Sequence, residues 1–149
     1  MDTKLKGDIA EHSVVLYALK QGWGVSKPYG DRLPYDLVLD VDGLLIKIQV
    51  KSAWLDKTKN NYVVDVRRTK TNRRNLVRSN YNKNDFDFAV IFVEDLGIFY
   101  IMPSEVFIGY GSEIHLVETD KRQRKPKSAC YKEAWHLILQ WAVPKVISE

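Results

Sequence analysis

The dipeptide Asp42-Gly43 stands between two runs of strand-forming, mostly apolar residues within the segment 34–51. Asp-Gly in this setting is a strong signal for a β-hairpin, because both central residues of the turn must accept a positive φ. If these two residues form the loop, Asp36 faces Gln49 across the hairpin. The sequence therefore predicts a hairpin whose register is fixed by its turn.

The two faces of this hairpin differ in character, because side chains alternate across a strand. One face carries apolar side chains only: Leu37, Leu39, Val41, Leu44, Ile46, Ile48 and Val50. The other face carries Asp36, Val38, Asp40, Leu45, Lys47, Gln49 and Lys51. On that face Asp36 and Gln49 are expected with their Cβ atoms about 5 Å apart, and Lys51 follows on the same side. A carboxylate, an amide oxygen and an ammonium thus converge at the open end of the hairpin.

These polar groups have the chemistry of a metal site. A hard divalent cation takes oxygen ligands, and Asp36, the Gln49 side-chain carbonyl and the Val50 backbone carbonyl would supply three, with water completing an octahedron. Such an ion polarises a phosphoryl oxygen and lowers the pKa of a bound water, while a neighbouring cation such as Lys51 stabilises the added negative charge of the transition state. The same spacing also fits an ordinary amphipathic hairpin with a solvated polar face and a cross-strand Lys-Asp pair.

Length and composition limit the class of protein. At 149 residues, 45% of them apolar, with four Trp, eight Tyr and five Phe, the chain has the size of one domain with a sizeable core. No run approaches 18 uncharged apolar residues, and the first residues lack the apolar region of a signal peptide. Cys130 is the single cysteine, which excludes an internal disulfide and, with three scattered histidines, a zinc cluster. We expect a cytosolic protein that binds no membrane, and we infer no protein partner beyond copies of itself.

Basic residues are unevenly distributed along the chain, whose formal net charge is +4. One cluster contains no carboxylate and comprises Arg67, Arg68, Lys70, Arg73, Arg74, Arg78 and Lys83. A second cluster comprises Lys121, Arg122, Arg124, Lys125, Lys127 and Lys132. Phosphates are the obvious partners, because each neutralised phosphate releases counterions and adds affinity that does not depend on sequence. A solvated basic surface, or a contact with an anionic protein, is the alternative.

Three basic loops are expected to contact DNA, at about residues 55–61, 67–84 and 119–130. The first contains a polar turn between two strands, with Lys57, Lys59, Asn60 and Asn61. Such a ribbon could enter a groove, where Asn, Lys and Arg side chains read base edges by paired hydrogen bonds, or it is only solvated. The second loop is too polar to pack, so we expect a long irregular segment with a helical turn at residues 75–79.

An amphipathic helix is expected over residues 8–21, closed by Gly22 in a left-handed conformation. Glu11 has two possible roles in this helix. It fits the third position of a capping box that begins at Asp8. It also shares a face with apolar residues directed at the sheet, where a carboxylate needs a partner such as a metal or a metal-bound water. In the loop that follows the helix, Lys27 could reach a phosphate.

The second half of the chain supplies the rest of the core. The near-continuous apolar run 86–93 predicts a central strand covered on both faces. A short helix capped by Ser104 follows, and a final helix is expected over residues 131–142. One face of the final helix carries Trp135, Ile138, Leu139 and Ala142. Trp135 belongs either to this core face or, with Trp141, to a subunit interface.

Asp36 is followed thirteen positions later by the triplet Gln49-Val50-Lys51, and Glu11 precedes both on the expected helix. This arrangement resembles the PD-(D/E)xK nuclease superfamily, which includes many restriction enzymes and junction resolvases. The chain length and the Gln-x-Lys variant look most like the small homing endonuclease encoded in cyanobacterial group I introns. The first motif reads Pro-Tyr-Asp rather than Pro-Asp, and Gln49 stands where most members have Asp or Glu. A neutral amide gives no charge to a metal, which bears on whether two ions are held as firmly as one.

The resemblance implies an α/β fold with a restriction-endonuclease-like core, in which helices flank a mixed central sheet, and a single nuclease domain over residues 1–149. The expected catalytic residues are Glu11, Asp36, Gln49 and Lys51, and the expected metal ligands are Asp36, Gln49, Val50 and Glu11. Lys51 would stabilise or orient the attacking water, and Glu11 would hold a second ion or a bound water. Magnesium is the expected ion, because all of these ligands are oxygen atoms.

The expected function is metal-dependent, site-specific cleavage of double-stranded DNA by a homing endonuclease that hydrolyses phosphodiester bonds. One active site per chain cannot cut two antiparallel strands at once, so a symmetric pair of subunits is implied. The resemblance implies a homodimer or a homotetramer built as a dimer of dimers. Two alternatives remain open: a resolvase that uses the same site on Holliday junctions, and a non-catalytic DNA-binding module on a nuclease fold.

Overall fold

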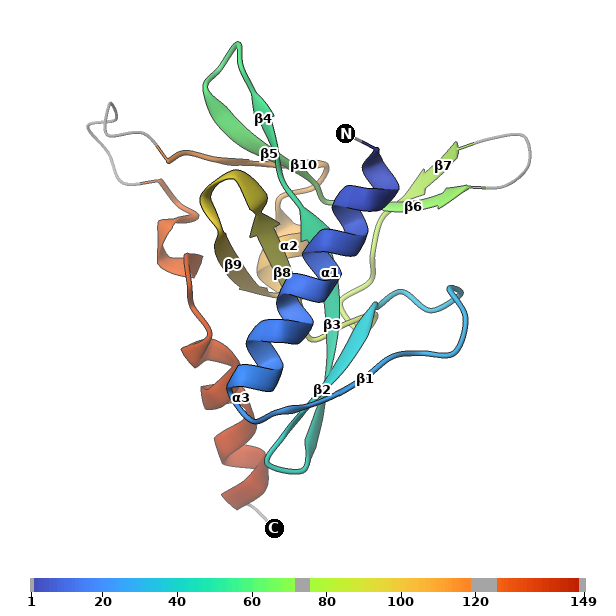
Figure 1. Ribbon diagram of the computed structural model, residues 1–149, viewed down its shortest axis with the longest axis vertical. Coiled ribbons are helices and arrows are strands. Elements are labelled where there is room, and N and C mark those ends of the chain that lie inside the picture. The colour runs from blue at the N-terminus through green and yellow to red at the C-terminus, as the bar shows by residue number, and fades with distance from the viewer. Residues whose placement is uncertain (1, 72–75, 119–125, 148–149) are drawn as a thin grey trace.

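The computed structural model describes residues 2–71, 76–118 and 126–147 (Figure 1). The elements are, in chain order, α1 (Thr3–Lys20), β1 (Gly24–Ser26), β2 (Leu37–Val41), β3 (Leu44–Ser52), β4 (Trp54–Asp56), β5 (Asn61–Asp65), β6 (Arg68–Thr71), β7 (Leu76–Ser79), β8 (Phe88–Val93), a 3-10 turn (Glu94–Leu96), β9 (Ile98–Pro103), α2 (Ser104–Gly109), β10 (Glu113–Leu116), a second 3-10 turn (Ala129–Tyr131) and α3 (His136–Ile147). A five-stranded mixed sheet has the order β1-β2-β3-β8-β9, β5 lies between β10 and β4 in a second sheet, and β6 and β7 form a two-stranded ribbon. The expected α/β class, with helices flanking a mixed central sheet, is confirmed.

The hairpin of β2 and β3 has the predicted register. The two strands pair antiparallel with Leu39 opposite Ile46, and Asp42 and Gly43 turn between them with φ angles of 53° and 86°. These are the positive values that an Asp-Gly turn requires. The predicted apolar face is the buried one, with exposed fractions of 1% or less at Leu37, Leu39, Val41, Ile46 and Ile48.

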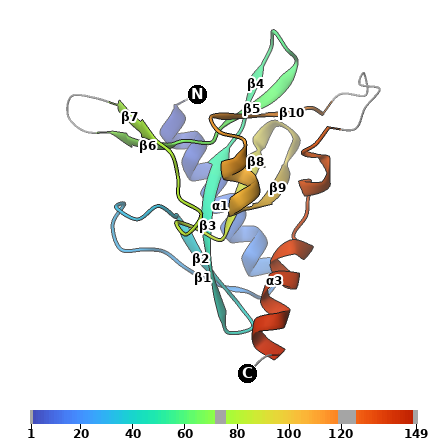
Figure 2. The ribbon, with the colours of Figure 1, turned by 180° about the vertical axis from the view of Figure 1, so that it is seen from behind.

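Strand β8 lies inside the sheet, between β3 and the edge strand β9, and all six of its residues are buried. It pairs parallel with β3 and antiparallel with β9. A parallel pair needs a crossover connection, and here the crossover contains β4, β5, β6 and β7. Helix α1 crosses one face of the sheet (Figure 1), and α2 lies on the opposite face, as the view from behind shows (Figure 2). The prediction that this strand is covered on both faces is confirmed, although β3 rather than β8 is the middle strand of the sheet.

Small residues let α1 approach the sheet closely. Ala10, Val14 and Ala18 lie on its buried face and pack on the apolar side of the hairpin. Trp135, which is 6% exposed, stacks on Tyr17 with ring centroids 3.9 Å apart. Trp135 therefore belongs to the core between α1 and α3 rather than to a subunit interface. None of the helices in the described part of the chain has the length and apolar character needed to cross a bilayer.

Helix α1 begins earlier than its apolar pattern predicts. Its N-cap is Asp2, whose side chain accepts a hydrogen bond of 2.9 Å from the backbone N–H of Lys4. Asp8 therefore lies inside the helix and cannot begin a capping box, which removes the capping role considered for Glu11. At the other end Gly22 has a φ of 80°, as expected for the residue that closes the helix.

The two later helices begin differently from prediction. The N-cap of α2 is Pro103, and the Ser104 hydroxyl donates to a backbone carbonyl of the chain before β8 at 3.1 Å instead of capping the helix. Helix α3 starts only at His136, because Glu133, with a φ of 51°, donates its N–H to a carbonyl of β9. Leu139 is 43% exposed and lies off the buried face that it was expected to share.

The segment 67–84 is not the predicted loop with a helical turn. Strands β6 and β7 pair antiparallel, with Arg68 opposite Ser79. A segment this polar cannot enter a core, but a two-stranded ribbon satisfies its backbone N–H and C=O groups while its side chains stay polar. Some predicted basic residues lie outside the described residues, namely Arg73, Arg74, Lys121, Arg122, Arg124 and Lys125.

Candidate active site

Asp36 stands where the ladder between β2 and β3 ends. Its backbone N–H donates to the carbonyl of Ile48 at 2.9 Å. Beyond this point the Asp36 side chain, rather than a backbone carbonyl, accepts the hydrogen bonds from β3. Its Oδ2 atom accepts hydrogen bonds of 2.8 Å from the backbone N–H of Val50 and from the side-chain amide of Gln49. Asp36 and Gln49 therefore meet across the hairpin, as the register predicts.

The amide of Gln49 joins two of the predicted ligand oxygens. Its Nε2 atom donates to the Oδ2 atom of Asp36 at 2.8 Å and to the backbone carbonyl of Val50 at 3.3 Å, and the residue is 8% exposed. The amide N–H donors thus occupy the place between two acceptor oxygens that a cation would take. A rotation of the Gln49 amide by 180° would exchange Nε2 for Oε1 and give a third oxygen ligand. The donor set of this site therefore fits a hard divalent cation.

Glu11 reaches the same site from α1. It forms an ion pair with Lys27, from the loop between β1 and β2, and its side chain is 18% exposed. The charges of both residues also act on Asp36: that of Glu11 raises its pKa and that of Lys27 lowers it. The structure thus brings Glu11 to the hairpin, and it gives Lys27 an acidic partner that its position in the sequence did not indicate.

The carboxyl of Asp36 is held in an environment that disfavours its charge. Burial raises its pKa above the usual value, and the charge of Glu11 adds to this effect. The N–H of Val50 and the ammonium groups of Lys51 and Lys27 lower the pKa and oppose the effect of burial without overcoming it. A cation bound to the Asp36 oxygens would relieve this cost, because it would stabilise the ionised form.

The ammonium of Lys51 lies between the hairpin site and the chain that follows β5. Its Nζ atom donates to the backbone carbonyl of Arg67 at 3.0 Å and lies 5.2 Å from the centre of the Tyr81 ring. Burial lowers the pKa of Lys51, and the carboxylates of Asp65 and Asp36 oppose this effect. Asp36 was the neighbour expected from the sequence, whereas Asp65 and Tyr81 reach the lysine only through the tertiary fold.

Carboxylates are few around this site. Within residues 2–71, 76–118 and 126–147, no group of three or more His, Cys, Asp or Glu side chains lies close enough to hold a metal ion. The acidic groups among the predicted ligands are Asp36 and Glu11, the other predicted ligands are an amide and a backbone carbonyl, and the carboxylate of Asp65 acts on Lys51. A bound ion would therefore meet less negative charge than at a site with three carboxylates.

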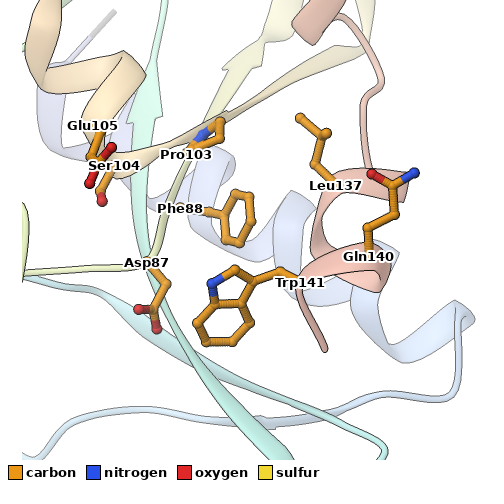
Figure 3. A pocket seen from close by; sticks show the side chains of 8 residues that line it. All are labelled: Asp87, Phe88, Pro103, Ser104, Glu105, Leu137, Gln140 and Trp141. Carbon is orange, nitrogen blue, oxygen red and sulfur yellow. The ribbon is translucent and has the colours of Figure 1, made fainter. Parts of the chain in front are cut away.

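A cavity of about 390 Å³ lies elsewhere, against β8, α2 and α3 (Figure 3). Phe88 and Trp141 form one wall, with their rings edge to face and 6.1 Å apart. Asp87 also lines the cavity, but its Oδ2 atom accepts a hydrogen bond of 2.8 Å from the backbone N–H of Lys47 and so holds the chain before β8 to β3. The described residues that line this cavity do not include those that meet Asp36. This cavity is therefore separate from the site at Asp36.

The turn between β4 and β5 presents three of the four DNA-binding residues predicted there. Lys57, Lys59 and Asn60 are exposed, and Asn60 closes the turn with a φ of 54°. Asn61 differs from the prediction, because it pairs with Asp56 as the first residue of β5 and is 9% exposed. The turn is shorter than its polar sequence suggests, and Asn61 is directed into the protein.

Arg67 and Arg68 lead from β5 into the ribbon of β6 and β7. The Nε atom of Arg67 lies 3.3 Å from the Oδ1 atom of Asp65, and the Nη2 atom of Arg68 donates to the carbonyl of Arg32 at 2.6 Å. This second contact ties the ribbon to the loop between β1 and β2, and both project on the same side of the molecule (Figure 1). Two further predicted DNA-binding residues, Lys70 and Arg78, lie on β6 and β7.

A sequence model of the PD-(D/E)XK endonuclease family matches residues 1–138. The chain belongs to this family. It is therefore an endonuclease, a hydrolase of phosphodiester bonds, and the expected membership of this superfamily is confirmed. Endonucleases of this family typically use a divalent metal ion, which agrees with the oxygen atoms gathered at the hairpin.

The solved structures that are similar to this endonuclease include the following two. A bacterial homing endonuclease, I-Ssp6803I, shares 66% sequence identity with a TM-score of 0.89, over 97% of each chain. MepB shares 17% identity with a TM-score of 0.45, over 85% of this chain and 93% of its own. A comparison with curated protein sequences found no match. The first structure confirms the expected fold and the expected likeness to a homing endonuclease.

Proposed function

We propose that this endonuclease is a homing endonuclease that makes site-specific double-strand breaks in DNA, with Mg²⁺ bound at the hairpin. The observation that carries the proposal is the contact of Asp36 with Gln49 and Val50, beside Lys51. It is supported by the similarity of nearly the whole chain to a bacterial homing endonuclease.

Each residue of the site has a distinct role in this function. Asp36, the Gln49 side chain and the Val50 carbonyl hold the cation, and Mg²⁺ suits ligands that are all oxygen atoms. When bound, the ion polarises a phosphoryl oxygen and brings positive charge to the reacting phosphate. Glu11 supplies a second carboxylate, for a second ion or a water molecule. Lys51 places its ammonium beside the phosphate and stabilises the negative charge that develops there in the transition state.

Basic and polar residues outside the site bind the DNA. Lys57, Lys59 and Asn60 contact it from the turn between β4 and β5, and Arg67 and Arg68 contact it from the base of the ribbon. The other predicted residues of the same interface are Lys70, Arg73, Arg74 and Arg78. Because each contact with a phosphate releases counterions, binding should weaken steeply as the salt concentration rises.

The function can be tested on a plasmid library that carries random inserts, incubated with the protein and either Mg²⁺ or EDTA. A homing endonuclease linearises only the plasmids that carry its target, and sequencing of the new ends defines one site. Breaks without sequence preference would contradict site specificity. A protein that retards plasmids on a gel but never breaks them would be a DNA-binding module. One that prefers a four-way junction to linear duplex would be a resolvase.

Two copies of the site are needed to cut both strands, because the strands run in opposite directions and each chain supplies one site. We therefore expect a homodimer or a homotetramer. Light scattering at the working concentration should give a mass of two or four times the 17.3 kDa of the chain. A mass near 17.3 kDa, under conditions in which both strands are cut, would contradict this assembly.

Replacing Gln49 by glutamate is expected to strengthen Mg²⁺ binding, because it adds negative charge beside Asp36. The Mg²⁺ concentration that gives half-maximal cleavage should fall about tenfold. The metal-free variant should melt at a lower temperature than the wild type, since two buried carboxylates repel each other. Gln49→Met, which keeps the length of the side chain but lacks an oxygen, should need more Mg²⁺ than the wild type. Equal Mg²⁺ dependence in all three proteins would show that Gln49 is not a ligand.

A further inference from the structure

We infer that Tyr81 is a positioning residue for Lys51, and that its ring and the backbone carbonyl of Arg67 together hold the ammonium group at the reacting phosphate. This role of Tyr81 rests on the proposed function, because it matters only if Lys51 acts in phosphodiester cleavage at the hairpin. Two contacts of the Nζ atom support it. They are 3.0 Å to the carbonyl oxygen of Arg67 and 5.2 Å to the centre of the Tyr81 ring.

The two contacts restrain Lys51 and still leave it able to act. A lysine side chain is a flexible four-carbon stem, and an ammonium that is held in place avoids a cost in conformational entropy at the moment of reaction. The Arg67 carbonyl takes one of the three N–H donors. The face of the Tyr81 ring attracts the positive charge without taking a directional hydrogen bond. Two donors therefore remain for oxygen atoms of the phosphate or of the attacking water.

The ring of Tyr81 is itself held by the core. Tyr81 is 6% exposed, and its ring meets that of Phe86 edge to face, with centroids 5.2 Å apart and planes at 89°. Phe107 lies behind, with its ring centroid at 6.5 Å. Both phenylalanines are at most 1% exposed. Because these rings pack on one another inside the protein, Tyr81 presents a fixed surface to the ammonium.

The position of the Arg67 carbonyl is supported by contacts of Arg67 with Asp65. Asp65, at the end of β5, accepts a hydrogen bond of 2.9 Å from the backbone N–H of Arg67, and its Oδ1 atom also lies 3.3 Å from the Arg67 Nε atom. These contacts fix the conformation of Arg67, whose carbonyl meets Lys51. The crossover between β3 and β8 thus supplies both walls around the ammonium.

A double-mutant cycle tests this role. The proteins are the wild type, Tyr81→Leu, Tyr81→Phe, Lys51→Met and the double variant Lys51→Met with Tyr81→Leu. Single-turnover cleavage of the target is measured with enzyme in excess and saturating Mg²⁺, and DNA affinity is measured separately without divalent ions. If Tyr81→Leu does not fold, Tyr81→Met takes its place, because an unbranched side chain fills the cavity more easily.

Tyr81→Leu is expected to slow the cleavage step about fivefold to thirtyfold with DNA affinity unchanged, and Tyr81→Phe, which keeps the ring, should restore the rate to within about twofold of the wild type. In the Lys51→Met background the leucine substitution should have no further effect. An equal loss in both backgrounds, or a Tyr81→Leu variant as fast as the wild type, would overturn the inference. If the wild type itself shows no Mg²⁺-dependent cleavage, the proposed function fails instead, so the two failures are distinguishable.

Discussion

Replacing Lys51 by methionine is expected to slow DNA cleavage by about a thousandfold and to leave DNA binding nearly unchanged. The substitution removes the ammonium that stabilises charge at the reacting phosphate, and one such group is worth about two to three orders of magnitude in rate. Lys51 is not among the proposed metal ligands, and methionine has a similar length, so the fold and the metal site should persist. Single-turnover cleavage of the selected target, followed over days for the variant, measures the loss.

Lys47→Met is the matched control for this experiment. Lys47 lies on the same face of β3 and is also partly buried, but its Nζ atom donates to the backbone carbonyl of Asn84 at 2.8 Å and lies 5.7 Å from the centre of the Tyr35 ring. Its cleavage rate should stay within about threefold of the wild type, as is usual for a substitution outside the site. If Lys51→Met and Lys47→Met cleave at the same rate, the role assigned to Lys51 is wrong.

Asp36→Asn is expected to abolish cleavage and, at neutral pH, to raise the stability of the metal-free protein. Burial raises the pKa of Asp36, so keeping this carboxylate ionised costs free energy of folding. Asparagine has no charge to bury, and its side-chain oxygen can still accept the hydrogen bond from Val50. We expect the melting temperature to rise by about 2–4 °C, the shift that about 1 kcal/mol gives in a chain of this size.

The pH dependence follows from the direction of that shift. A carboxyl whose pKa is raised on folding binds its proton more tightly in the folded chain. The free energy of unfolding of the metal-free protein therefore falls as the pH rises from the unfolded pKa of Asp36 through its folded pKa. The melting temperature of Asp36→Asn should therefore exceed that of the wild type at neutral pH, and the difference should shrink as the pH is lowered through this window. Melting curves of both proteins from pH 4 to pH 8, without metal, measure it.

Magnesium gives the complementary observation. A ligand that binds the folded protein raises its melting temperature, so Mg²⁺ should stabilise the wild type and have little effect on Asp36→Asn. Asp42→Asn is the control, because it makes the same change of charge at the exposed turn of the hairpin, where asparagine also accepts a positive φ. An equal rise on adding Mg²⁺ in the Asp36→Asn and Asp42→Asn variants would show that Asp36 does not bind the ion.

The hairpin could be predicted closely because its determinants are local. Asp42-Gly43 fixes the turn, and a period of two residues then decides which side chains share a face. Asp36 opposite Gln49, and the burial of Leu39 and its neighbours, follow from that pattern alone. The segment whose structure is predicted most closely from the sequence is thus also the segment that carries most of the proposed metal ligands.

Other features depend on contacts that no local pattern contains. Asp2 begins α1 well before the apolar periodicity does, which decides against a capping box at Glu11. The sequence of β6 and β7 is as polar as that of a loop, and the pairing of their backbones is not marked by any apolar pattern. Tyr81 and Asp65 lie far along the chain from Lys51, and only the crossover brings them to it.

In the proposed function, the hairpin residues bind the catalytic metal ion beside the scissile phosphate. A crystal structure with the target DNA, obtained with Ca²⁺ in place of Mg²⁺ to slow cleavage, tests this proposal most directly. We predict a cation about 2.3–2.6 Å from oxygen atoms of Asp36, Gln49 and Val50, with the scissile phosphate between that cation and the ammonium of Lys51. A cation bound away from these oxygens, or a scissile phosphate out of reach of Lys51, would contradict this account.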